Sequence, residues 1–168
     1  MPKQINKLSE SEFHEVFANI FENASWVAKK LYMQKPFENF DDLSKKIIAI
    51  FENADEQSKL KILKSHPDLA DKTKIGLLTQ DSKNEQNDAG LDECTKEEFN
   101  EFKNLNLKYK NKFGFPFIFA VKGKKKLEIL ENFKKRFLFN RENEFKEAIR
   151  QVTRIASLRL AELSDKFI

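Results

Sequence analysis

Residues 104–123 read NLNLKYKNKFGFPFIFAVKG, and this stretch decides the fold class. Its first half repeats apolar or aromatic residues four positions apart, at Leu105, Tyr109 and Phe113. This spacing predicts a helical stripe, and Gly114 predicts the end of that helix. The apolar run around Pro116 is too short and too interrupted for a helix, so we expect an extended apolar segment over residues 114–123. Its backbone donors and acceptors need partners, and a bound ligand is one source of them.

The rest of the chain also favours helices, because four Gly and four Pro in 168 residues leave few breaks. Apolar residues recur at helical spacing in six further stretches, at about 13–21, 26–31, 43–51, 60–63, 127–137 and 141–163. Three pairs have the spacing of capping boxes at helix starts: Ser9 with Glu12, Ser82 with Glu85, and Thr95 with Glu98. No alternating strand pattern or linker is present. We predict one all-α domain over residues 1–168, a compact bundle of about seven to nine helices.

Composition excludes several classes of function. The net charge is +4, with 27 acidic residues interleaved among 31 basic ones. The densest basic cluster, Lys122 with residues 124–126, has no aromatic residue to stack on a base, which argues against nucleic-acid binding; an anion-steering patch stays open. Cys94 is the only cysteine, and no phosphate-binding loop or His/Cys ligand pair is present. We therefore expect no metal and no cofactor. No signal peptide or membrane-spanning run is evident, so we expect a cytoplasmic protein without a membrane partner.

The two histidines differ in their surroundings. His14 lies between acidic residues in an amphipathic stretch and is typical of a surface residue. His66 stands in Ser-His-Pro-Asp, at a helix end beside a proline turn. Imidazole titrates near neutral pH, so a histidine at a rigid turn is an acid/base candidate. A capping histidine that interacts with the helix dipole is the alternative.

Residues 79–91, TQDSKNEQNDAGL, are dense in short polar side chains. Helix capping explains Ser82 and Glu85, and the alternative, a polar ligand cradle at a helix N-terminus, is compatible with it. Arg154 and Arg159 lie on the last predicted helix. They are typical of surface residues, but an arginine beside the apolar face could also clamp a carboxylate in bidentate fashion.

Three motifs in a fixed order now carry a resemblance. They are His66-Pro67-Asp68-Leu69-Ala70; Leu78-Thr79 with Ser82, Glu85-Gln86 and Ala89-Gly90-Leu91; and Leu105-Asn106 with Tyr109 and Lys112-Phe113-Gly114-Phe115-Pro116-Phe117-Ile118. The tail adds Arg136, Asn140, Glu144, Ile155-Ala156 and Arg159-Leu160. Together they resemble the OHCU decarboxylase family over essentially the whole chain. OHCU is 2-oxo-4-hydroxy-4-carboxy-5-ureidoimidazoline, an intermediate of urate breakdown.

The resemblance implies an all-helical, cofactor-free and usually dimeric enzyme whose product is S-allantoin. It implies catalytic roles for His66 and Glu85. The implied substrate-binding residues are Pro67, Ser82, Lys83, Asn84, Glu85, Gln86, Phe117, Ile118, Phe119, Ala120, Val121 and Arg159. We accordingly expect a homodimer that decarboxylates OHCU. Two alternatives stay open: a helical interaction module without activity, and a related lyase that acts on another small ureido or keto acid.

Overall fold

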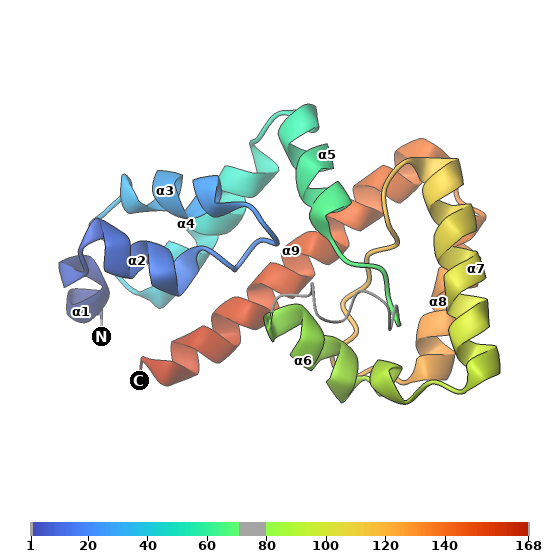
Figure 1. Ribbon diagram of the computed structural model, residues 1–168. Helices are drawn as coiled ribbons and strands as arrows, with labels where there is room; N and C mark the ends of the chain where they lie inside the picture. Colours follow the sequence, from blue (N-terminus) through green and yellow to red (C-terminus); the bar gives the residue numbers. More distant parts are fainter. Residues whose placement is uncertain (1, 71–79, 168) are drawn as a thin grey trace. The chain divides into compact units, whose positions relative to one another are not determined.

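A computed structural model describes residues 2–70 and 80–167 (Figure 1). In these two ranges every regular element is a helix, which confirms the all-α prediction. The elements are α1 (Pro2–Lys7), α2 (Glu10–Phe17), α3 (Ser25–Tyr32), α4 (Phe40–Glu52), α5 (Glu56–Ser65), α6 (Gln80–Asp88), the 3₁₀ helix η2 (Leu91–Glu93), α7 (Lys96–Phe113), α8 (Lys126–Phe137) and α9 (Arg141–Lys166). Contacts divide the chain into a first unit, Met1–Ile62 with Thr153–Ile168, and a second unit, Leu63–Val152.

Local sequence signals explain most of the helix ends. Ser9 with Glu12 and Thr95 with Glu98 form complete capping boxes, in which the side chain of each residue accepts a hydrogen bond from the backbone N–H of the other. Gly114 ends α7 with φ +81°, and its N–H donates to the Lys110 carbonyl at 2.8 Å. These three predictions are confirmed.

The predicted capping box at Ser82 and Glu85 is wrong. Ser82 is the third residue of α6 rather than the residue before it. The Ser-x-x-Glu spacing also fits one face inside a helix, where residues three apart are neighbours. The same four-residue pattern therefore does not separate a helix start from a helix interior.

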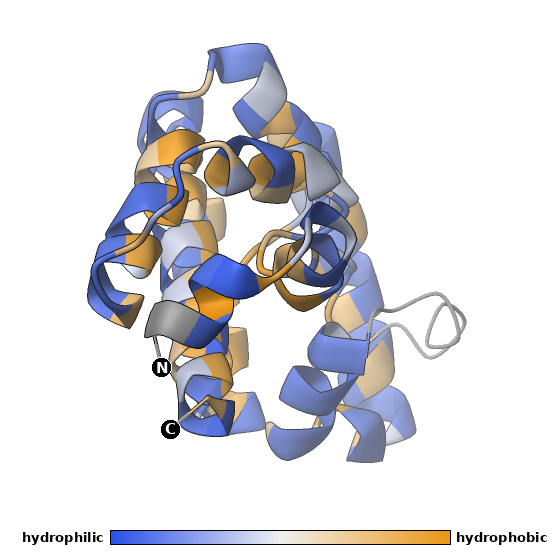
Figure 2. Cartoon of the chain, turned by 90° about the vertical axis from the view of Figure 1, so that its left-hand side faces the viewer, coloured by the Kyte–Doolittle hydropathy of each residue, from blue (hydrophilic) through white to orange (hydrophobic). Residues whose placement is uncertain are grey.

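The first unit has an aliphatic and aromatic core between amphipathic helices (Figure 2). Its largest fully buried side chains come from α1 to α4 and the turn after α2: Ile5, Phe13, Phe17, Phe21, Leu31 and Phe51. A buried ion pair lies in the same unit, where Arg159 of α9 is 3.1 Å from the carboxylate of Glu22. None of the helices in the described ranges is long and apolar enough to cross a membrane.

The second unit is built around Tyr109 of α7, which is fully buried. Its ring makes edge contacts with Phe115, Phe117 and Phe133, at centroid distances of 5.5–6.0 Å. Phe117 also stacks on Phe133 of α8, with centroids 4.0 Å apart. These contacts bury Phe115 and Phe117 in the non-helical segment 114–125, which connects α7 to α8, so these two aromatic residues after Gly114 serve as core.

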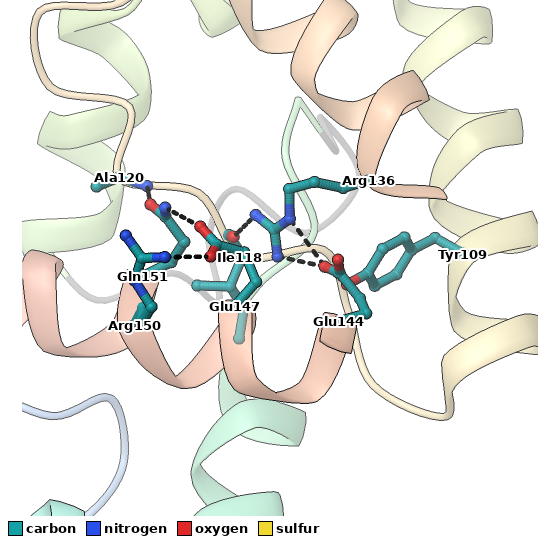
Figure 3. A network of polar contacts seen from close by, with 8 residues as sticks. All are labelled: Tyr109, Ile118, Ala120, Arg136, Glu144, Glu147, Arg150 and Gln151. Carbon is teal, nitrogen blue, oxygen red and sulfur yellow. Dashed lines mark hydrogen bonds and ion pairs between the residues drawn. The ribbon is translucent and has the colours of Figure 1, made fainter. Parts of the chain in front are cut away.

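Charged groups lie inside this aromatic core (Figure 3). The Arg136 guanidinium donates to the Glu144 carboxylate and to the Ile118 carbonyl, and it also packs 4.5 Å from the Phe117 ring centre. The Tyr109 hydroxyl donates to the same Glu144 oxygen. Burial, followed by the hydrogen bond to Glu144, raises the pKa of Tyr109, so its hydroxyl stays a donor. Arg136 is 3% exposed and Glu144 0%, so neither charge is solvated by bulk water.

Removal of the negative charge should leave the Arg136 charge without compensation. We predict that Glu144→Gln lowers the free energy of unfolding by about 3–5 kcal/mol, as expected for a broken buried ion pair. Glu101→Gln is the matched control, because its ion pair with Lys134 is exposed and should contribute no more than about 1 kcal/mol. Denaturant unfolding of the two variants and of the wild type measures the loss of unfolding free energy in each variant. Equal losses would contradict a structural role for the buried pair.

Candidate functional site

His66 follows directly on the last residue of α5, as predicted. Its N–H donates to the Leu63 carbonyl at 3.2 Å, which closes the last turn of the helix. Pro67 then prevents the helix from continuing. The His66 side chain is 9% exposed, so it is held within the protein rather than extended into solvent.

The loop of residues 66–70 is held from one side by Gln86 of α6. The Gln86 Oε1 accepts from the Ala70 N–H at 3.0 Å, and its Nε2 donates to the Asp68 carbonyl at 3.3 Å. Ala70 has φ +58°, a left-handed conformation that is unfavourable for a residue with a Cβ. The bond to Gln86 helps to hold this conformation. The Gln86 side chain therefore shapes the loop that carries His66.

The same loop is held from a second helix, α7. Asn106 donates its Nδ2 to the Leu69 carbonyl at 3.0 Å, and the Lys110 ammonium is 2.7 Å from the Asp68 carboxylate. Asn106 was part of a family motif without an assigned role, and sequence reasoning missed Lys110. A signal was available, because Asn106 is the one polar member of the buried face of α7, which is Phe102, Asn106, Tyr109 and Phe113. A buried amide on an apolar stripe needs a hydrogen-bond partner.

Helix α6 is polar throughout, yet it buries Ser82 and Gln86, which are 4% and 8% exposed. They lie four residues apart and so share a face. Glu85 is half-buried, while the side chains of Lys83 and Asn84 are exposed. Asn84 accepts a hydrogen bond from Gln80 at 2.7 Å. Residues 82–86 were all predicted to bind the substrate, and of these five only Ser82 and Gln86 are buried.

The segment 117–121 uses part of its backbone within the protein (Figure 3). The Ile118 carbonyl accepts from Arg136, and the Ala120 N–H donates to Gln151 of α9 at 3.0 Å. The expectation that a ligand takes up the backbone groups of the segment is therefore wrong for these two. In the part of the chain that is described, the N–H and C=O of Phe119 have no hydrogen-bond partner.

The predicted site residues fall into both units. His66, Pro67, Ser82–Gln86 and Phe117–Val121 belong to the second unit, and Arg159 belongs to the first. In the first unit the Arg159 guanidinium donates to the Asn19 carbonyl and the Glu22 carboxylate, both at 3.1 Å.

Helix α7 links the two parts of the site in the second unit. Asn106 and Lys110 hold the His66 loop, while Tyr109 packs against Phe117. A histidine, a hydroxyl, amides and free backbone groups suit acid/base chemistry on a small polar ligand. No cluster of three or more His, Cys, Asp or Glu with metal-site geometry occurs among the described residues.

Comparisons with known proteins point to one family. A family model described as OHCU decarboxylase matches residues 6–161. The chain is 44% identical over 161 residues to a uric acid degradation bifunctional protein of Bacillus sp. (strain TB-90). The matched residues make up 96% of this chain but only 32%, about a third, of that relative. It is 35% identical to the 2-oxo-4-hydroxy-4-carboxy-5-ureidoimidazoline decarboxylase of Halalkalicoccus jeotgali, covering 96% of this chain and 90% of the relative.

A solved structure has the same fold. The crystal structure of an (S)-allantoin synthase superposes with a TM-score of 0.76 at 27% identity, covering 97% of this chain and 54% of that one. The match of the family model over nearly the whole chain, the identity to relatives across their length and the shared fold lead to one conclusion: this chain belongs to the OHCU decarboxylase family.

Proposed function

We propose that this protein decarboxylates OHCU to (S)-allantoin in urate breakdown, without a metal or organic cofactor. The observation that carries the proposal is the 35% identity to a decarboxylase of that name over 90% of its length. The family match over residues 6–161 supports the assignment of the whole chain, 1–168, to one domain of this kind. The resemblance to this usually dimeric family also leads us to propose a cytoplasmic homodimer.

The substrate can supply its own electron sink. Its carboxylate is bonded to a carbon next to a C=N bond, so the electrons of the broken C–C bond form a C=C bond as CO₂ leaves. The C=N electron pair moves to nitrogen, which takes up a proton. The resulting enol then loses its hydroxyl proton and gains one on carbon, which gives the carbonyl of allantoin. The protein has to supply orientation, proton transfer and a chosen face for the carbon proton.

We assign these tasks to the residues of the candidate site. His66 moves the protons, and Glu85 binds and orients N–H groups of the ring or the ureido arm. Ser82, Gln86 and the backbone of residues 117–121 bind the substrate, with Pro67, Lys83 and Asn84 beside them. Arg159 pairs with the reacting carboxylate. The buried positions of His66 and Ser82 support these assignments, since little water competes there.

The reaction itself is the first test. Purified protein should speed the loss of OHCU absorbance and give one allantoin enantiomer, seen as a lasting circular dichroism signal. Dialysis against a strong chelator should leave the rate unchanged. Racemic product at the spontaneous rate would favour an inactive interaction module, and turnover of a different ureido or keto acid would favour a related lyase.

His66 should be needed for turnover. We predict that His66→Ala lowers kcat by about 100- to 10,000-fold, the usual contribution of acid/base catalysis. Far-ultraviolet circular dichroism checks that the variant is folded. His14→Ala is the control, because His14 lies in α2 of the first unit, and it should keep the wild-type rate. A His66 variant with near wild-type kcat would remove this residue from the mechanism.

Glu85 should act in binding rather than in helix capping, because it lies inside α6. We predict that Glu85→Gln strongly lowers kcat/KM with little change in melting temperature, since the neutral amide loses a charge-assisted hydrogen bond to the substrate. Glu98→Gln is the matched control, because Glu98 caps α7. It should lower the melting temperature slightly and leave kcat/KM intact. The reverse pattern in the two variants would make Glu85 a structural residue.

A further inference from the structure

Gln151 on α9 is a buried amide with two fixed partners. Its Oε1 accepts from the Ala120 N–H at 3.0 Å, and its Nε2 donates to Glu147 at 2.9 Å. The side chain is only 7% exposed. A backbone N–H can only donate and a carboxylate can only accept, so both bonds are made in just one orientation of the amide. Gln151 is thus a directed link between Glu147 and the segment.

Glu147 is itself held in place. Its second oxygen is 3.1 Å from Arg150, whose side chain is 79% exposed. A line of polar contacts therefore runs from the surface through Glu147 and Gln151 to the backbone of Ala120 (Figure 3). The carboxylate at one end makes the Gln151 donor bond charge-assisted, and such a bond is stronger than a neutral one.

Peptide planarity extends this effect to Phe119. The Ala120 N–H and the Phe119 C=O belong to one trans peptide unit, in which they point in opposite directions. The bond to Gln151 therefore directs the Phe119 carbonyl away from α9. Likewise, the Ile118 carbonyl bonded to Arg136 shares a peptide unit with the Phe119 N–H. The two anchors thus direct the Phe119 carbonyl away from Gln151 and the Phe119 N–H away from Arg136, and neither group has a partner among the described residues.

A donor and an acceptor on the same residue match a ligand that carries neighbouring C=O and N–H groups. A cyclic amide or a ureido arm has such an edge. We propose that Gln151 is a positioning residue: it fixes the peptide plane between Phe119 and Ala120 so that Phe119 reads the amide-like edge of the substrate. The identity of that substrate as OHCU rests on the proposed function. Gln151 does not touch the substrate in this proposal.

Gln151→Leu keeps most of the side-chain volume but removes the acceptor. The freed peptide plane should weaken binding in the ground state and the transition state alike, so KM for OHCU should rise roughly tenfold or more while kcat changes little. The control is Ala148→Gly, which destabilises the same helix and leaves both anchors unchanged. It should lower the melting temperature without a comparable rise in KM.

An exchange of the two side chains tests the direction of the link. Gln151→Glu alone places two carboxylates four residues apart, which disfavours the contact, so KM should rise. The double variant Glu147→Gln with Gln151→Glu keeps a donor at 147 and an acceptor at 151, and KM should return to within roughly threefold of wild type. If Gln151→Leu does not fold, the KM values of Gln151→Glu and of the double variant still test the proposal.

The outcomes separate this proposal from the proposed function. A wild type that does not turn over OHCU overturns both. An active wild type with unchanged KM in Gln151→Leu, or with no rescue in the double variant, overturns the positioning role alone. Amide hydrogen exchange adds a readout without turnover: the Ala120 N–H should be protected in the wild type and lose that protection in Gln151→Leu. Equal exchange of this amide in both proteins also overturns the role of Gln151.

Discussion

A buried positive charge is the constraint on which the second unit depends. Arg136 has almost no contact with solvent, so its guanidinium needs partners inside the protein. Glu144 supplies the opposite charge, and the Ile118 carbonyl and the Phe117 ring occupy further sides. Since Ile118 and Phe117 belong to the non-helical segment, compensation of the charge also fixes the path of that segment.

Helix α7 contacts both the non-helical segment and the loop of residues 66–70 that carries His66. Tyr109 shares the carboxylate of Glu144 with Arg136 and packs against the segment. One residue on, Lys110 holds Asp68, and three residues before Tyr109, Asn106 holds the Leu69 carbonyl. A single helix therefore sets the register of both the segment and the histidine loop. Side chains four or fewer positions apart on one rigid element keep a defined spacing.

Sequence reasoning reached the local features and missed the long-range ones. The helix from Thr95 to Gly114 and the non-helical run after it follow from spacing and from one glycine, so they are readable in the chain. The capping spacing at Ser82 failed because it occurs equally inside a helix. The partners of Ile118, Ala120 and Leu69 lie 18 to 37 residues away, and no periodicity encodes them. The family resemblance included Asn106 and Arg136 but not their structural roles, and it did not include Lys110 or Gln151.

The polarity of α6 has a further thermodynamic consequence. A helix of nine residues without a large apolar side chain gains little from the hydrophobic effect, and short helices are marginal by themselves. The hydrogen bonds that Gln86 makes to Asp68 and Ala70 contribute to its order. Local opening of α6 should therefore require less free energy than opening of the aromatic core. A ligand bound to its buried face would stabilise that corner, so binding and local folding would be one coupled equilibrium.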